Sequence, residues 1–226
     1  YDLAARNGKL RAWCIVMTFN STSVHLSGST ASELLDHLVA VISSKGFLSK
    51  QGLNNEVPFF ICPYKAELSV NMQRLYAQLC KQLKQKEVRV LEINLYDLCL
   101  EILTKRNLLN RILDHESKMT KSKIKETLNG VLDPARHLVP AISEKAKVAE
   151  FDVLFITGVG EVFPYIRSHN VLNNLQSAVK KHPVVMFFPG SYQHDLATGA
   201  SLDLFSRLQD DKYYRAYNIL TMKAVS

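Results

Sequence analysis

The sequence lacks the segments that place a protein in or across a membrane. No window reaches the roughly 18 consecutive apolar residues that a membrane-spanning helix requires. The first residues also lack the basic and then apolar pattern of a signal peptide, so the sequon Asn20-Ser21-Thr22 has no meaning for glycosylation. We therefore expect a cytoplasmic protein without membrane contact.

Cysteine is scarce and widely spaced. The chain has four cysteines, Cys14, Cys62, Cys80 and Cys99, with no C-x-x-C pair among them. A zinc site needs closely spaced ligands, because two elements must converge on one ion. The spacing therefore predicts reduced, mostly buried thiols, and we expect neither a metal ion nor another cofactor.

The motifs of nucleotide hydrolysis and of nucleophilic catalysis are also missing. A Walker A loop places a lysine and a Ser/Thr beside a helix start, where they reach the phosphates and Mg²⁺, and no such loop occurs. The chain contains no G-x-S-x-G elbow, and no cysteine has a nearby histidine to activate it. These absences predict a protein that is not an enzyme.

What the chain does contain is the composition of a globular protein. Its 226 residues fit one α/β domain with or without an appendage, and 47% of them are hydrophobic, which argues against disorder. The net charge of +7 permits a nucleic acid or an acidic protein as partner. Because the Ser/Thr-rich lead has no apolar period, we expect an N-terminal extension or linker over 1–30 and the α/β domain over 31–226.

Short apolar segments alternate with amphipathic ones along the chain. The first kind is typical of strands buried on both faces, and the second has the helical period. This alternation predicts one doubly wound, mainly parallel five-stranded sheet flanked by helices, resembling a nucleotide-binding scaffold without a Walker A loop. The predicted strands are 57–62, 88–95, 151–157, 183–188 (ended by Pro189-Gly190) and 213–219. The predicted helices are 32–44, 68–83, 96–113, 118–149 with a break at Asp133-Pro134, 166–181 and 201–208.

The segment Thr157-Gly158-Val159-Gly160 follows the third predicted strand and precedes a helix. Glycines at such a place let backbone N–H groups approach a phosphate. The dinucleotide fingerprint G-x-G-x-x-G needs a third glycine, however, and Phe163 holds its place. A simple turn is therefore favoured over a nucleotide loop.

Polar side chains follow the third and fourth predicted strands, where doubly wound sheets bind their ligands. Glu161, His169, His194 and Asp195 form a candidate metal or acid–base cluster there. The simpler alternative is favoured. In it, Glu161 caps the N-terminus of a helix, His169 supplies polar surface to that helix, and Asp195 lies in a loop.

A basic strip lies in the predicted helices that follow the second strand. Its residues are Lys105, Arg106, Arg111, Lys118, Lys121, Lys123 and Lys125. Such a strip can neutralise phosphates, which predicts at most weak, sequence-independent DNA binding. A solvated helix face is the favoured alternative, because the strip has no aromatic residues on which bases could stack.

Aromatic side chains gather in three turns at the predicted carboxyl edge of the sheet, over residues 63–64, 158–165 and 189–192. With a neighbouring arginine they form a candidate surface for binding a partner protein: Tyr64, Phe163, Tyr165, Arg167 and Tyr192. Exposed aromatic residues are costly to leave in water, and rigid strands would hold them ready for a partner. The alternative is that they pack on one another and close the domain.

Five blocks of the sequence together carry a resemblance to a known family. They are NEVPFFICPYKAEL, VLEINLYDLCLEIL, FDVLFITGVGEVFPYIRSHNVLNNLQ, PVVMFFPGSY and DDKYYRAYNI. In this order they resemble the BrxB family of bacterial BREX phage-defence systems, over residues from about 31 to 220. The resemblance implies a component needed for host methylation and phage exclusion, and it carries over no catalytic residues.

The resemblance also implies partners. A BrxB-like protein would work beside PglZ, which is alkaline-phosphatase-like, the large ATPase BrxC and the methyltransferase PglX. We expect an assembly or adaptor protein that binds PglZ in particular. The alternative is a protein of the same defence system that binds nucleic acid or nucleotide weakly.

Overall fold

The computed structural model describes residues 28–49, 59–179, 181–195, 199–205, 208–209 and 216–223. Its centre is a sheet with the strand order β2-β3-β4-β1-β7, in which all neighbouring strands are parallel. These strands are β1 (Phe59–Tyr64), β2 (Val90–Asn94), β3 (Val153–Thr157), β4 (Val184–Asp195) and β7 (Ala216–Asn218). The predicted α/β fold with five parallel strands is confirmed. Within the described residues, β5 (Gly199–Leu204) and β6 (Leu208–Gln209) extend the sheet with antiparallel pairs.

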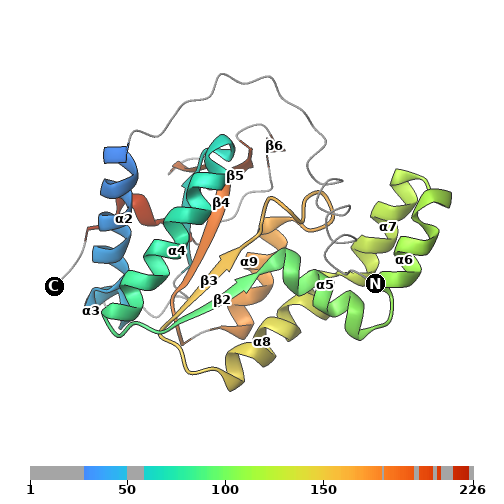
Figure 1. The fold of residues 1–226 in the computed structure, drawn as a ribbon, viewed down its shortest axis with the longest axis horizontal. Helices are drawn as coiled ribbons and strands as arrows, with labels where there is room; N and C mark the ends of the chain where they lie inside the picture. Colours follow the sequence, from blue (N-terminus) through green and yellow to red (C-terminus); the bar gives the residue numbers. More distant parts are fainter. Residues whose placement is uncertain are drawn as a thin grey trace.

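Helices cover both faces of the sheet (Figure 1). On one face lie α2 (Gly28–Ile42), α3 (Lys45–Leu48) and α4 (Ser69–Gln85), and on the other lie α5 (Leu95–Lys105), α8 (Val139–Val148) and α9 (Ser168–Ala178). The remaining elements are α6 (Leu109–His115), α7 (Lys121–Val131), η1 (Ala66–Leu68), η2 (Glu116–Lys118), η3 (Pro134–Leu138) and η4 (Ile219–Thr221). In Figure 1, α6 and α7 form the end of the molecule opposite to α2. None of the described helices is long and apolar enough to cross a membrane.

Successive residues of one strand enter different hydrophobic cores, because side chains of a strand alternate between its two faces. On β3, Val153 and Phe155 pack with α2 and α4, whereas Leu154 and Ile156 pack with α5, α8 and α9. Both faces of the strand are thus buried. This explains the continuous apolar run in the sequence.

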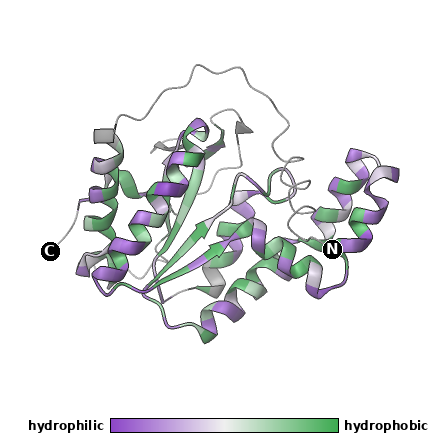
Figure 2. Cartoon of the chain, in the orientation of Figure 1, coloured by the Kyte–Doolittle hydropathy of each residue, from purple (hydrophilic) through white to green (hydrophobic). Residues whose placement is uncertain are grey.

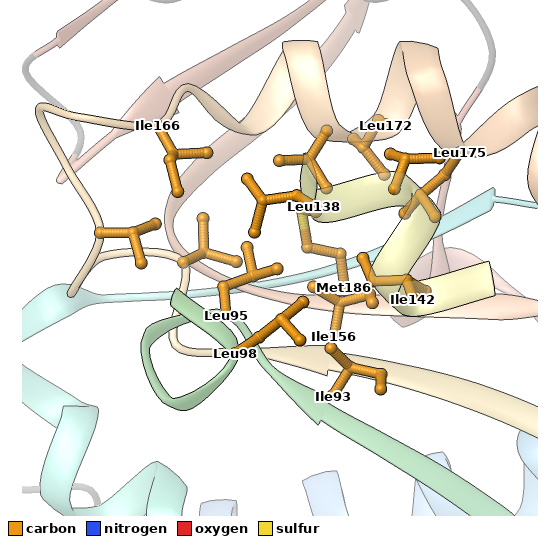
Figure 3. Packing of buried hydrophobic residues seen from close by; sticks show 14 of the residues in the cluster. Ile93, Leu95, Leu98, Leu138, Ile142, Ile156, Ile166, Leu172, Leu175 and Met186 are labelled. Carbon is orange, nitrogen blue, oxygen red and sulfur yellow. The ribbon is translucent and has the colours of Figure 1, made fainter. Parts of the chain in front are cut away.

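Side chains interdigitate in the core on each face of the sheet. On the α4 side, the rings of Phe155 and Phe187 meet at 5.2 Å, and Tyr76 packs edge-on against Phe187 at 5.1 Å. On the other side, aliphatic residues of the sheet and of η3, α8 and α9 interdigitate, among them Ile156 and Leu172 (Figure 3). Each such side chain contributes about 1.5–3 kcal/mol when it is fully buried.

The prediction that the fourth strand ends at Pro189-Gly190 was wrong, as was the helix predicted over 201–208. Strand β4 continues through both residues to Asp195 and forms an antiparallel hairpin with β5. The missing Cβ of Gly190 lets β4 approach β5 closely enough to pair with it, since a Cβ there would lie 2.2 Å from the carbonyl oxygen of Asp203. On β5, buried Leu202 and Leu204 flank half-buried Asp203, which is the period of a strand.

The single helix predicted over 96–113 is interrupted. Helix α5 ends at Lys105, and Asn107 then adopts a φ of 54°, in the left-handed region that asparagine tolerates better than most residues. Helix α6 starts two residues later. The predicted break at Asp133-Pro134 is confirmed, because the Asp133 side chain accepts a hydrogen bond from the Arg136 N–H at 2.8 Å and caps η3.

The described cysteines agree with the sequence analysis. Cys62 and Cys99 are buried, Cys80 is half-buried, and all three are free thiols. Cys14 lies outside the described residues, together with residues 1–27 and with 213–215 of the last predicted strand.

Candidate functional site

A cleft opens at the carboxyl edge of the sheet, where β1, β2 and β3 end. It has a volume of about 710 Å³ and lies between the first turns of α4 and the segment that follows β3. Its lining residues include Tyr64, Ser69, Gln73, Tyr76, Glu92, Asn94, Tyr96, Thr157, Glu161, Phe187 and Phe205. This is the edge at which doubly wound sheets bind ligands, so the fold and the cleft agree on the location of a site.

Gly158 allows the segment after β3 to pack closely on β2 and α5. Its φ is 72°, and a Cβ at this position would lie 2.3 Å from Oδ1 of Asn94. That oxygen accepts hydrogen bonds from the N–H groups of Tyr96 at 2.9 Å and Asp97 at 3.3 Å, and so caps α5. The glycine therefore serves contact within the protein, in agreement with the turn that the sequence analysis favoured.

Gly160 has the same kind of role on the other side of the turn. A Cβ there would lie 2.9 Å from the Pro189 ring and 3.1 Å from the Phe205 ring. Helix α9 begins only at Ser168, with Arg167 as its N-terminal flanking residue. Phosphate binding requires a helix N-terminus directly after the glycines. No helix begins there, because α9 starts several residues later. The interpretation of Glu161 as a cap of that helix is wrong for the same reason.

Tyr64 and Glu161 lie close to each other in the cleft. The pKa of Tyr64 is raised to about 12, mainly by burial; a hydrogen bond with the Ser69 side chain opposes the rise, and Cys62 and Glu161 add to it. The Ser69 hydroxyl also donates to the carbonyl of Ala66 at 2.6 Å. Tyr64 is neutral at physiological pH, as an ordinary tyrosine is, and the raised pKa keeps it neutral into the alkaline range.

Tyr76 on α4 and Glu92 on β2 form a second polar pair in the cleft. Burial raises the pKa of Tyr76 far above its ordinary value, and the nearby Cys80 and Glu92 raise it further. Its hydroxyl oxygen is buried without a hydrogen-bond partner of ordinary geometry. Thr157 donates a long hydrogen bond of 3.4 Å to Oε1 of Glu92. Neither residue was predicted from the sequence, although a lone glutamate in the apolar run VLEIN was a signal.

The five predicted partner-binding residues differ in how far they are exposed. Tyr64 lines the cleft, and Arg167 is exposed. Phe163 and Tyr165 are half-buried against the core, and the Phe163 ring meets Phe205 edge-on at 6.2 Å. Tyr192 is only 8% exposed, and its hydroxyl donates to the carbonyl of Ala216. For Tyr192 the alternative holds: the side chain closes the domain and does not face a partner.

The predicted cluster of Glu161, His169, His194 and Asp195 is not assembled among the described residues. Glu161 lines the cleft, whereas His169 is 6% exposed in the first turn of α9 and does not line it. His194 and Asp195 pair with β5 at the end of β4, and their side chains lie outside the described part of the chain. That part contains no group of three or more His, Cys, Asp or Glu side chains arranged to hold a metal ion.

The basic strip lies on a different part of the surface. All seven of its residues are exposed, on or just after α5 and on α6, η2 and α7, and hydrophilic residues alternate with hydrophobic ones in the ribbon at this end of the molecule (Figure 2). Lys105 pairs with Glu101 at 2.8 Å, and Lys123 pairs with Glu126 at 2.9 Å. The strip is thus a solvated surface separate from the cleft.

The fold and the cleft together define a class: a doubly wound α/β protein with an acidic and aromatic cleft in place of a phosphate loop. The model of the family described as BrxB, BREX protein BrxB, matches residues 91–219. A BREX protein BrxB from Bacillus cereus (strain H3081.97) is 37% identical over 200 residues, covering 84% of this chain and 97% of that protein. A BREX protein BrxB from Escherichia coli O9:H4 (strain HS) is 26% identical over 186 residues, covering 82% of this chain and 90% of that protein.

The chain belongs to the BrxB family, which confirms the resemblance seen in the sequence. No solved structure matches the chain.

Proposed function

We propose that this BrxB-family protein is a non-enzymatic assembly component of a BREX system. In this role it binds other BREX proteins, with PglZ as its main partner, and supports host methylation and phage exclusion. BrxC and PglX are the further partners to test. The observation that carries the proposal is a preformed cleft that is unsuited to phosphates.

The charge of the cleft argues against a nucleotide. Glu92 and Glu161 are among its described lining residues, whereas none of those residues is a lysine or arginine. The N-terminus of α4 adds a partial positive charge, roughly half a unit, which the two carboxylates outweigh. A triphosphate would therefore enter an acidic cleft without a cation to neutralise it, and phosphoryl transfer depends on such neutralisation.

The surface beside the cleft suits a protein partner. Tyr165 is half-buried against the core, which holds its ring in place, and Arg167 is exposed at the start of α9. Tyrosine and arginine are the residue types that most often anchor protein interfaces. The proposed docking surface comprises Tyr64, Phe163, Tyr165 and Arg167.

The test is a pull-down of PglZ, BrxC and PglX, each alone, by the purified protein with and without nuclease. We expect capture of PglZ that survives nuclease. The substitutions Tyr165→Ala and Arg167→Ala should weaken that complex by about 1–2 kcal/mol each, while Arg74→Ala on the exposed face of α4 serves as control. Capture that disappears with nuclease, or unchanged affinity in the double variant, would contradict the proposed docking.

A second candidate function is weak DNA binding through the basic strip. The exposure of all seven basic residues favours DNA binding, because an exposed cationic side chain can approach a phosphate. Lys105 and Lys123 already form ion pairs on the surface, and Arg106 donates a hydrogen bond to the carbonyl of Val131, so the effective charge of the strip is smaller than the sum of its seven charges. Any DNA binding should thus be sensitive to salt and indifferent to sequence.

A further inference from the structure

We propose that the carboxyl-edge cleft receives a cationic side chain, an arginine that a partner protein presents on an exposed segment. This inference rests on the proposed adaptor function, since it names the chemistry by which the partner is recognised. Three properties of the cleft carry it: the sign of its charge, its aromatic walls and its size.

The charge of the cleft is opposite to that of the whole chain. The sequence has a net charge of +7, yet the charged residues among the described lining of the cleft are Glu92 and Glu161. Glu92 lies on β2 near Tyr76, and Glu161 follows β3 near Tyr64. A basic surface repels cations in general, so a local acidic cleft selects the place where one can bind.

The walls of the cleft suit a guanidinium group better than an ammonium group. Its lining contains five aromatic residues: Tyr64, Tyr76, Tyr96, Phe187 and Phe205. A guanidinium is planar, stacks on aromatic rings and donates in a fork that fits a carboxylate. The hydroxyl of Tyr64 is protonated at neutral pH, so its oxygen is a neutral acceptor and brings no further charge into the cleft.

The size of the cleft excludes a bare ion as its natural occupant. A volume of about 710 Å³ lies in the range of sites for drug-sized ligands and accommodates a side chain together with its flanking backbone. The described residues also offer no group of three metal ligands. A short peptide segment that carries an arginine fits the volume, the charge and the walls at once.

The experiment is a titration of the full chain, followed by backbone amide NMR, with the blocked peptide acetyl-Gly-Arg-Gly-amide. Its matched control is the same peptide with citrulline, which has the shape of arginine without the charge. We expect saturable shifts at residues 69–73 and 157–161, with the citrulline peptide at least about tenfold weaker. Equal binding of both peptides, or stronger binding of ATP at these residues, would overturn the proposal. Tighter binding of free agmatine than of the peptide would also overturn it, because the cleft would then be a small-molecule site.

Variants locate the binding within the cleft. Glu92→Gln with Glu161→Gln removes both charges at nearly constant shape, and we expect the affinity for the arginine peptide to fall about tenfold or more. Glu67→Gln is the matched control, because Glu67 is exposed on the adjacent η1 and does not line the cleft. An equal loss in Glu67→Gln would show a general charge effect and overturn the assignment. Thermal unfolding of each variant verifies that the fold is intact.

The two proposals fail in different ways. If PglZ is captured equally by the wild type and by the Glu92→Gln, Glu161→Gln variant, the arginine site is refuted and the adaptor function stands. If the wild type captures no BREX protein but binds the arginine peptide in the cleft, the adaptor function is refuted and the cation site stands.

Discussion

The two glycines after β3 show how single residues shape the site. The absence of a Cβ on Gly158 leaves room for the capping oxygen of Asn94, and its absence on Gly160 leaves room for the rings of Pro189 and Phe205. A sequence pattern of two glycines after a strand is shared by nucleotide loops and by turns that need close packing. Only the neighbours of each missing Cβ distinguish the two, and these neighbours come from β2, β4 and the end of β5.

Substitution of Gly158 by alanine should therefore be costly. We expect Gly158→Ala to lower the free energy of unfolding by about 2 kcal/mol or more, because alanine disfavours a φ of 72° and its Cβ displaces the Asn94 cap. Urea denaturation measures the change. Gly130→Ala in α7 is the control, because its Cβ would meet nothing within 4 Å, and stability should stay equal or rise by up to about 1 kcal/mol. Equal effects of the two substitutions would contradict this account.

Cys62, in the middle of β1, predicts a pH dependence of stability. Burial raises the pKa of its thiol from 9.0 to about 12, so the folded state holds this proton more tightly than the unfolded state does. The tighter binding of this proton stabilises the folded state. The stabilisation is constant below about pH 9 and is lost as the pH rises from about 9 towards 12. Urea denaturation at a series of alkaline pH values should show the fall. In Cys62→Val, which keeps an apolar side chain of similar size, the free energy of unfolding should fall less over this pH range. If the variant loses as much stability as the wild type, groups other than Cys62 cause the loss.

At the scale of whole elements, the sequence predicted the parallel sheet well and the hairpin poorly. Strands β1 and β3 are apolar runs buried on both faces, and this signal is local. The extension of β4 past Pro189 depends on pairing with β5, so the local sequence of β4 does not predict it. The helix break at Asn107 depends on a left-handed backbone conformation, which asparagine tolerates but does not require, so the residue type alone did not predict it.

The helices α6 and α7 and the η2 turn between them carry the prediction on DNA. Binding should be weak, independent of sequence and steeply dependent on salt, as measured by fluorescence anisotropy with two unrelated duplexes. If Lys118, Lys121 and Lys125 all bind phosphates, their joint change to Gln should lower the salt slope by about 0.9 for each phosphate that is no longer neutralised. The matched control changes the exposed Lys81, Lys84 and Lys86 on and just after α4. Sequence-specific binding at physiological salt would contradict the adaptor proposal.

For the whole molecule, the doubly wound sheet provides a rigid frame with one acidic cleft and a separate basic end. A cleft at the carboxyl edge would also be the place for a nucleotide. The distinction depends on charge and on the position of α9, whose N-terminus lies several residues beyond the glycines. The architecture is therefore a doubly wound α/β fold whose edge lacks the charge and the helix position that phosphate binding needs.

The purified protein should accordingly show no turnover of ATP or GTP. It lacks the Walker A lysine, and the described cleft residues supply no cation to stabilise the transferred phosphoryl group. A coupled phosphate-release assay with Mg²⁺ measures this. Steady turnover that is abolished by Glu161→Gln, but retained in the Glu67→Gln control, would refute the proposal that the protein is not an enzyme.

The sequence by itself determined the family, the α/β class and the order of the main parallel strands and their helices along the chain. These properties depend on local apolar periods and on blocks of residues that can be recognised in order. Only the tertiary structure decided which side chains share the cleft. Tyr76, Glu92 and Glu161 come from α4, β2 and the segment after β3, and they meet because parallel strands place their carboxyl ends along one edge. It also decided that Tyr192 turns inward to Ala216, since burial depends on neighbours that are distant in the sequence.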